Sequence, residues 1–272
     1  MFFNSKSLLP ISFIFSLQFI IAQELSQEEK EKDTINYRCY TATQITTIGD
    51  KSDTAILRIC KKRLHTIFKL NKKYTYSASL IDTNNVVLST SNVYLIGTNE
   101  IRQDDKQQTY INIIFDRQKD DSSKLQTYLD NKTCCSWINS YKTGVIEGED
   151  YVYIHPIQYN QFIQTEIVGF PQVYLPLDIK KSWNNSTSIY AWGDWKGKEI
   201  KSKYKVLSKK EYSMKNEKLD CWKVECISNF DGKTNKLIFL FNELHGFVQM
   251  NYEFSNGNKI IFEMKDYIYD SK

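Results

Sequence analysis

The sequence predicts a mainly β protein with antiparallel sheets, and three observations favour this class. Its 272 residues are 14% aromatic, with 18 Tyr and 15 Phe, while Gly and Pro number only 10 and 4. Aromatic and β-branched residues suit a pleated, half-buried surface better than a helix. Short runs of such residues recur between turn-forming clusters, and the last third of the chain alternates apolar with polar residues. We therefore expect an N-terminal β unit followed by a curved C-terminal meander, half-barrel or sandwich-like.

The first 23 residues have the pattern of a secretory signal peptide. Lys6 precedes an apolar run from Leu8 to Ala22, and the polar, acidic sequence ELSQEEKEKD follows. A spanning helix needs roughly 20 apolar residues, so the run favours a signal cleaved near Gln23 over an uncleaved anchor helix. No Cys follows the run, so we expect no lipid anchor there. We expect an exported chain, periplasmic or extracellular, with no integral membrane span after signal removal.

Charge and composition argue against a nucleic-acid partner. The chain is 41% hydrophobic and 25% charged, which is typical of a globular rather than a disordered protein. Its 36 basic and 32 acidic residues leave a formal net charge of only +4. The Lys-rich stretches KKRLHTIFKLNKKY and KGKEIKSKYKVLSKK place cations between apolar residues, which indicates solvated strand faces rather than a phosphate-binding stripe.

We divide the expected mature chain into three parts. Residues 24–125 form an N-terminal antiparallel β unit, because strand-like runs from Tyr37 to Arg117 are separated by turn-forming clusters. Residues 126–150 form a linker with a short helix, since apolar alternation stops in DRQKDDSSKLQTYLDNK. Residues 151–272 form a C-terminal antiparallel β domain. It begins with an extended segment that contains three of the four prolines, because Pro lacks a ladder donor and suits edges and crossings.

Apolar parity predicts the register at the end of the chain. Apolar residues alternate with polar ones from 248 to 254, and the same parity continues to 264 after SNGN. Because opposed residues in a hairpin share a face, their numbers must sum to an even value here. A three-residue loop at Ser255–Gly257, with its glycine left-handed, meets this condition and pairs Met250 with Phe262. A two-residue Asn-Gly turn would break the parity.

The same argument extends backward along the chain. It pairs Phe239 with Met250 and leaves Glu243–Gly246 as a four-residue loop whose glycine supplies a positive φ. One strand earlier, DCWKVECIS should turn Trp222, Val224 and Cys226 toward the core, opposite KLIFLF. The turn between these two strands contains Asp231-Gly232. The result is a four-stranded meander with one continuous apolar face.

Glu243 and His245 are the sharpest catalytic candidates in the sequence. A carboxylate can orient an imidazole as a general base. However, the sequence has no G-x-S-x-G elbow and no H-E-x-x-H motif, and a loop tip lacks the desolvation that tunes catalytic pKa values. We interpret the pair as turn residues and predict no catalytic residue.

Six cysteines in an exported chain favour disulfides over metal or thiol chemistry. If the runs on either side of GDKSD form a hairpin, residues whose numbers sum to 99 oppose one another. Cys39 and Cys60 meet this condition, so we predict a cross-strand disulfide between them. Cys221 and Cys226 lie five residues apart on one strand, point to opposite faces and cannot bridge each other.

Adjacent Cys134 and Cys135 do not favour a mutual bond, because a vicinal disulfide distorts the peptide between them. One of them, assigned here as Cys135, can reach Cys221 and tie the linker to the second β unit. Cys226 is equally well explained as a small buried hydrophobe. No C-x-x-C occurs and the three histidines lie far apart in sequence, so we expect no metal and no cofactor.

The segment SWNNSTSIYAWGDWKG is the favoured ligand-contact region. Its aromatic residues Tyr190, Trp192 and Trp195 lie beside Asp194. Aromatic planes next to a carboxylate can stack on sugar rings or line an apolar pocket. The alternative is that these large side chains pack into the core or a sheet corner.

The segments HPIQYNQFIQTEIVGFPQVYLPLDIKKSW, LDCWKVECIS, FLFNELHGFVQMNYEF and KIIFEM, between residues 150 and 267, resemble exported bacterial β domains of unknown function. Such domains are similar in outline to the half-barrel carriers of lipoproteins in the bacterial envelope. The resemblance implies a concave sheet able to hold an acyl chain. It implies no functional residue for this chain.

Together these observations favour a non-catalytic exported protein of the cell envelope that binds an apolar ligand or partner segment on a sheet face. A lipid or a glycan is the expected ligand. One rival is a secreted hydrolase that uses His245 or His155 with a nearby carboxylate. Another is a carbohydrate-binding module that uses the Trp183–Trp195 region.

Overall fold

The computed structural model describes residues 37–48, 51–62, 64, 66–103, 107–116, 138–190, 193–215 and 217–269, with the backbone alone from 37 to 61. Most residues within these ranges lie in strands. The elements are β1 (Tyr37–Ile48), β2 (Lys51–Lys62), β3 (Lys72–Ile81), β4 (Val87–Ile101), β5 (Thr109–Phe115), β6 (Ser140–Glu147), β7 (Tyr151–Ile154), η1 (Asn160–Ile167), β8 (Gln172–Tyr174), β9 (Ser182–Ser188), η2 (Gly193–Trp195), β10 (Glu199–Met214), β11 (Glu217–Phe230), β12 (Lys233–Asn242), β13 (Gly246–Glu253) and β14 (Lys259–Tyr269), where η marks a 3-10 helix. The prediction of a mainly β, antiparallel fold is confirmed.

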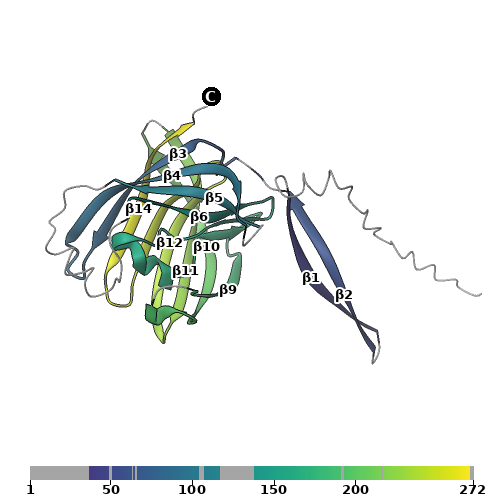
Figure 1. Ribbon diagram of the computed structural model, residues 1–272. Helices are drawn as coiled ribbons and strands as arrows, with labels where there is room; N and C mark the ends of the chain where they lie inside the picture. The colour runs from purple at the N-terminus through teal and green to yellow at the C-terminus, as the bar shows by residue number, and fades with distance from the viewer. Residues whose placement is uncertain are drawn as a thin grey trace, which may run out of the picture.

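Twelve strands form one antiparallel sheet in the order β8-β7-β6-β5-β4-β3-β14-β13-β12-β11-β10-β9, and β1 and β2 form a separate two-stranded sheet. The chain therefore runs from the middle of the large sheet to one edge, passes to the other edge, and returns to the middle (Figure 1). There β14 pairs with β3, so the sheet continues across the two β units predicted from the sequence. In the described part of the chain, β8 and β9 are the edge strands of this sheet.

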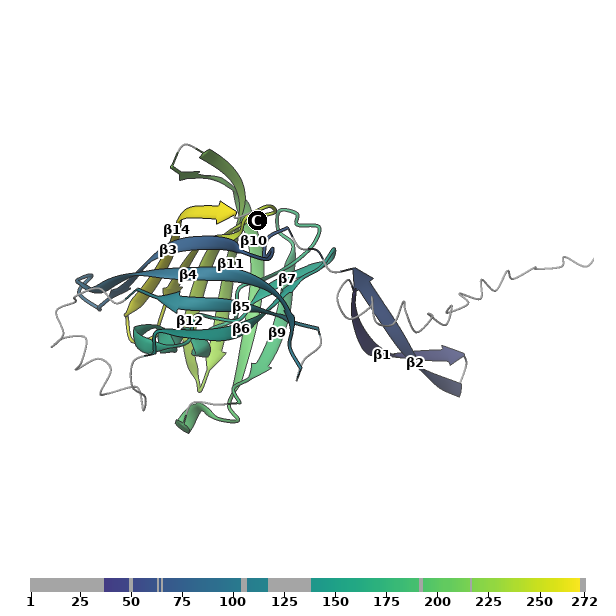
Figure 2. The same cartoon turned by 45° about the horizontal axis from the view of Figure 1, so that its top comes forward.

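The sheet folds over on itself. Strands β3, β4, β5 and β6 cross over β10, β11 and β12, as the two views show (Figures 1 and 2). Strands of a large sheet are rotated relative to their neighbours, and this twist accumulates over twelve strands. One apolar cluster fills the space between the halves and includes Tyr76 and Leu95 from one half and Phe239 and Tyr252 from the other. This shared lining is called the inner face below.

Most predicted registers are confirmed. Met250 pairs with Phe262, and Gly257 in the three-residue loop has a φ of 85°. Phe239 pairs with Met250, and Val224 lies opposite Phe239 on the neighbouring strand. These strands follow the parity of their apolar residues because a slip by one residue would turn every inner side chain to solvent.

The loop between β12 and β13 is one residue shorter than predicted. The register shifts between Leu240 and Phe241, so Phe241 pairs with Phe247 and the loop contains only residues 243–245. The shift turns Phe247, which breaks the sequence alternation, onto the buried face, where its ring centroid lies 5.3 Å from that of Phe241. Gly246 ends the turn with a φ of 74°, as predicted.

The structure differs from the expected division of the chain at two further places. Strand β6 occupies residues 140–147 of the predicted 126–150 linker, and residues 117–137 lie outside the described part of the chain, as does the predicted signal peptide 1–23. The Pro-containing segment after β7 is not extended throughout, because residues 160–167 form the 3-10 helix η1. Within the described ranges, no helix has the length and apolar character needed to cross a bilayer.

Candidate functional site at the inner face

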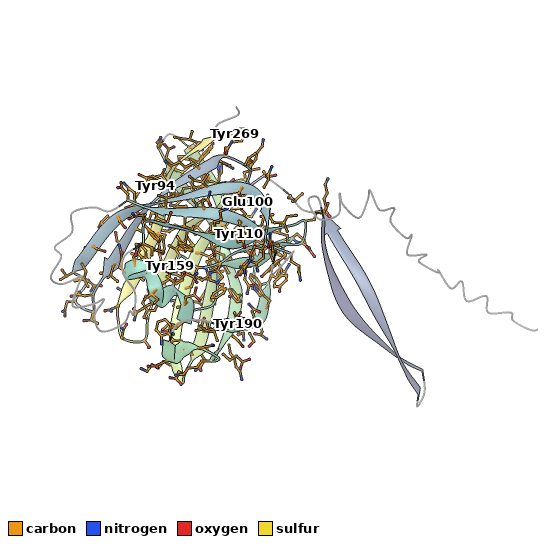
Figure 3. The ribbon with its side chains drawn as sticks, viewed as in Figure 1. Tyr94, Glu100, Tyr110, Tyr159, Tyr190 and Tyr269 are labelled. Carbon is orange, nitrogen blue, oxygen red and sulfur yellow. The ribbon has the colours of Figure 1, made fainter. Side chains whose placement is uncertain are left out.

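Residues 155–171, called the strap here, connect β7 to β8 and lie against the inner face. The two strands pair with each other, with Val152 opposite Val173. Paired strands are usually joined by two to five residues, and connections longer than about 12 residues commonly serve a function. In Figure 3 the label Tyr159 marks the beginning of η1, in front of the strands of the C-terminal half. Six consecutive residues of η1, 161–166, are buried.

Polar contacts from five strands hold the strap. The Tyr141 hydroxyl of β6 accepts a hydrogen bond from the Gln158 amide of the strap at 3.1 Å. On the opposite side, the Asn235 side chain of β12 donates to the Ile167 carbonyl at 3.2 Å. Gln161 donates to Ser91 of β4 at 3.3 Å, and the Gly169 amide donates to Ser228 of β11 at 2.7 Å. The Tyr204 hydroxyl of β10 donates to the Phe170 carbonyl at 2.8 Å. The strap is therefore attached to both halves of the sheet.

Phe162 is the apolar centre of the strap. Its side chain is fully buried, with ring centroids 6.0 Å from Phe115 of β5 and 5.0 Å from Phe262 of β14. Such contacts bury a large apolar area and stabilise the closed position. In the structure, the inner face is thus covered by a side chain of the protein itself.

Gly169 allows a close approach between the strap and the sheet. A Cβ atom at this position would lie 2.4 Å from Cys226 Sγ and 2.7 Å from the Tyr204 hydroxyl. A larger residue there would require the strap or these side chains to shift. Cys226 itself has no exposed surface.

Glu166 and His155 form a buried pair at the strap. Glu166 is 3% exposed, and its Oε1 atom lies 3.5 Å from His155 Nδ1. Burial raises the pKa of the Glu166 carboxyl to about 8. Burial also lowers the pKa of His155 to about 4, against an opposing effect of the Pro156 carbonyl. Both groups are therefore uncharged at neutral pH, as expected where water is excluded.

Several buried polar atoms at the strap have no hydrogen-bond partner in the described part of the chain. They are Gln161 Oε1 and Glu166 Oε1 on η1 and Gln172 Nε2 at the start of β8. An unpaired buried polar group costs roughly 1–3 kcal/mol. The strap thus combines favourable apolar burial with polar groups that would gain hydrogen bonds by moving into water or by meeting a polar ligand group.

The pair at the strap also bears on the hydrolase alternative. The structure brings His155 close to a carboxylate, as that alternative requires. However, a pKa of about 4 makes the neutral His155 imidazole a weak base, and the Glu166 carboxyl is protonated at neutral pH and closed off from solvent, so this pair lacks a base of suitable strength and an accessible reaction centre. The pair therefore supports the packing of the strap more directly than a reaction.

The catalytic candidates Glu243 and His245 have different environments in the structure. Glu243 is exposed and accepts a 3.4 Å hydrogen bond from Trp222 Nε1. His245 is only 8% exposed and its ring lies 4.4 Å from that of Tyr267, so our expectation that both residues lie at an exposed tip is wrong for His245. The shortened loop explains the difference, because it draws His245 against β14.

The favoured ligand-contact residues have different environments. Tyr190 is 85% exposed, whereas Trp195 packs edge-on against Phe230 with ring centroids 6.2 Å apart. Trp192 lies outside the described residues. Trp183, at the sheet edge, stacks on Tyr204 at 5.2 Å. The ligand-binding assignment of Tyr190, Trp192 and Trp195 stays a prediction.

The disulfide predictions also stay open. Cys39 and Cys60 are paired in the backbone register of β1 and β2, as the sum rule requires. Cys221 and Cys226 are free, buried thiols, and Cys135 lies outside the described residues. Burial raises the pKa of the Cys221 thiol to about 12 and that of Cys226 to about 11. Among the described residues, no group of His, Cys, Asp and Glu side chains is suited to a metal ion.

Sequence reasoning missed the strap as a site. The available signal was the stretch QFIQTEIVGF, where Gln161, Gln164 and Glu166 interrupt apolar residues without the alternation of a strand. Only the fold shows that these polar residues are buried.

No family model and no curated protein matches the sequence. Two solved structures are similar in fold. One is a protein inferred to be exported, with a YmcC-like fold, from Bacteroides fragilis (8% identity, 76% of this chain and 100% of that chain covered, TM-score 0.44). The other is an inferred lipoprotein from Parabacteroides distasonis (8% identity, the same coverage, TM-score 0.42).

Proposed function

We propose that the protein is an exported, non-catalytic component of the cell envelope that binds an apolar ligand on the inner face of its sheet when the strap moves aside. The observation that supports this most directly is the kind of cover the inner face has. Between the two halves of the sheet, part of the inner face is covered by the 17-residue strap, and this connection buries unpaired polar atoms.

The energetics favour an exchange of the strap for a ligand. Phe162 occupies apolar surface between β5 and β14, and an acyl chain offers the same kind of surface. When the strap leaves, the unpaired atoms of Gln161 and Glu166 gain solvent. Binding then depends on how often the strap opens, because a ligand selects the open state in proportion to its population.

The test is uptake of cis-parinaric acid, a fluorescent fatty acid, by delipidated full-length protein. We expect saturable binding at one molecule per chain, and tighter binding by Phe162→Ala because this change weakens the closed state. Phe254→Ala is the matched control, since Phe254 is a buried core residue at the β13–β14 turn outside the strap. It should destabilise the fold without improving uptake.

Two results would contradict the proposal. One is no uptake by either the wild type or Phe162→Ala. The other is equal improvement in Phe162→Ala and Phe254→Ala, which would assign uptake to general loosening of the core. Mass spectrometry of lipid that co-purifies with the native protein would identify the natural ligand.

A further inference from the structure

A second concave feature lies on the opposite, outer face of the sheet. A groove of about 500 Å³ crosses β9, β10, β11 and β12 near the β9–β10 hairpin. Its outward-facing side chains include Asn184 and Ser186 of β9, Lys201 and Lys203 of β10, and Asn229 of β11. These five side chains are exposed and alternate with buried or half-buried residues of the same strands, so they point away from the inner face. Ser228, which also lines the groove, is buried and accepts the Gly169 amide of the strap.

Strand register explains why this part of the sheet is hollow. Lys201 lies between Ser186 and Asn229, and Lys203 lies between Asn184 and Ile227. Each row therefore has a long cation at its centre and shorter side chains on both sides. The side chains of opposed residues lie about 5 Å apart on one face of a sheet. The short side chains of Ser186, Asn229 and Asn184 therefore leave space beside the longer lysine side chains.

The charged residues that line the groove are both lysines, and the carboxylate of Glu199 lies at its end, in contact with Lys201 and Ser186. Lys203 has no ion-pair partner among the described residues, and Lys201 contacts Glu199 at the groove's end, with 3.4 Å between Nζ and Oε2 and both side chains largely exposed. Exposed pairs of this kind contribute little, so an anionic ligand can replace Glu199 as the partner of Lys201.

The uncharged groups of the groove fit a carbohydrate. The amides of Asn184 and Asn229 can donate and accept hydrogen bonds, which matches the hydroxyls of a sugar. The Ser186 hydroxyl donates to Glu199 Oε1 at the groove's end. Ile227, 40% exposed, and the lysine stems offer apolar surface to a ring face. Tyr190 continues the outward-facing positions of β9 beyond the groove and projects into solvent, toward the lower end of the molecule in Figure 3.

We propose that this outer groove is a binding site for an acidic oligosaccharide, with Lys203 and Lys201 on the carboxylates and the amides on the sugar hydroxyls. A single-stranded nucleic acid fits less well, because the groove lining contains no aromatic side chain on which bases could stack. The site adds glycan recognition to a protein whose proposed inner-face ligand is apolar.

The experiment is isothermal titration of the full-length protein with tetragalacturonate at low and physiological salt. We expect binding that weakens about tenfold in Lys203→Ala, the loss of one charge-assisted contact. Lys210→Ala removes an exposed lysine from the other end of β10 and should leave the affinity unchanged. Glu199→Gln should tighten binding, because it frees Lys201 and removes the nearest negative charge.

Two further probes test the chemical class. The methyl ester of the same oligosaccharide keeps the rings but not the charges, so it should bind at least tenfold more weakly. A polyglutamate peptide keeps the charges but not the rings. Equal binding of peptide and sugar would reveal simple ion exchange and overturn the proposal, as would no binding of tetragalacturonate or an equal loss in Lys203→Ala and Lys210→Ala.

Discussion

Two buried carboxylates of this protein, Glu147 and Glu166, differ in their hydrogen-bond partners. Glu147, 6% exposed at the end of β6, accepts three backbone amides: those of Thr66 and Ile67 on Oε1, at 2.8 and 2.9 Å, and that of Phe68 on Oε2, at 2.9 Å. Glu166, 3% exposed in the strap, keeps an unpaired Oε1 and has a pKa raised by burial to about 8.

The difference separates a carboxylate that is fixed by backbone donors from one whose Oε1 atom lacks a partner. Amide donors replace the water that Glu147 loses, so the loop before β3 is fixed to β6. Nothing comparable replaces water at Glu166, whose burial depends on the apolar contacts of Phe162. A strap with this balance opens at lower cost than the loop, which is what the proposed inner-face function requires.

The largest expected effect concerns Glu147. Replacement by Ala leaves three backbone amides without a partner, two of them in buried contacts, and should lower the free energy of unfolding by roughly 3–5 kcal/mol. Urea denaturation followed by tryptophan fluorescence measures this. The exposed Glu149→Ala serves as control and should change stability by less than about 0.5 kcal/mol. A loss below about 1 kcal/mol in Glu147→Ala would mean that the loop is not fixed in this way.

The second prediction concerns pH and Glu166. Because its folded-state pKa is raised from 4.5 to about 8, its stabilising contribution is complete below pH 4.5 and is lost as the pH rises toward 8. His155, with its pKa lowered to about 4, acts in the opposite sense below pH 6.5, where stability is lost as the pH falls. The window from pH 6.5 to 8 therefore isolates Glu166.

Across this window the free energy of unfolding should fall by roughly 1–2 kcal/mol in the wild type. Glu166→Gln should remove that fall, since an amide does not titrate. The exposed Glu253→Gln should retain it. Denaturant curves at several pH values provide the measurement, and an unchanged pH slope in Glu166→Gln would show that the carboxyl is hydrated in the closed state.

The third prediction uses the two buried thiols as reporters. Both thiols are buried, with 0% of Cys226 and 1% of Cys221 exposed. Cys226 lies next to Gly169 of the strap, whereas Cys221 lies nearer the start of β11. Both thiols have pKa values far above neutrality, so the ratio of their alkylation rates is insensitive to pH below about 9.

Phe162→Ala should raise the ratio of Cys226 to Cys221 labelling several-fold, because local opening of the strap exposes only Cys226. Peptide mass spectrometry after timed iodoacetamide treatment gives both rates in one sample. If the two thiols gain reactivity together, the strap does not open separately from the sheet.

The smallest effect is expected at His245, near the Glu147 region. Desolvation and the neighbouring Lys72 lower its pKa, so it is neutral and packs on Tyr267. His245→Phe retains the ring contact and should change stability by less than about 1 kcal/mol. A larger loss at neutral pH, measured by thermal denaturation, would assign a polar role to the unpaired Nδ1 atom.

The strand registers were largely predictable from the sequence, for a physical reason. Side chains alternate between the two faces of a strand, so the apolar positions around Met250 and Phe239 restrict the pairing to one parity. The bulge at Phe241 was not predictable, because Phe247 breaks the alternation and the local cost of a bulge depends on the space available in the folded core.

The candidate sites were predictable only in part. Tyr190 was predicted to be a ligand-contact residue; the structure shows that it is 85% exposed, and its role in binding stays a prediction. The outer groove depends on which short side chains flank Lys201 and Lys203 in neighbouring strands, and those neighbours lie up to 28 positions away in sequence.

The sequence by itself determined the class of secondary structure, the faces of the C-terminal strands and the pairing of Cys39 with Cys60 in a hairpin register, because these depend on local alternation. Tertiary structure alone decided that β14 joins β3, that residues 155–171 cover the inner face, and that Glu166 is buried while Glu243 is not. Burial of a carboxylate depends on which distant surfaces close over it, and no local pattern contains that information.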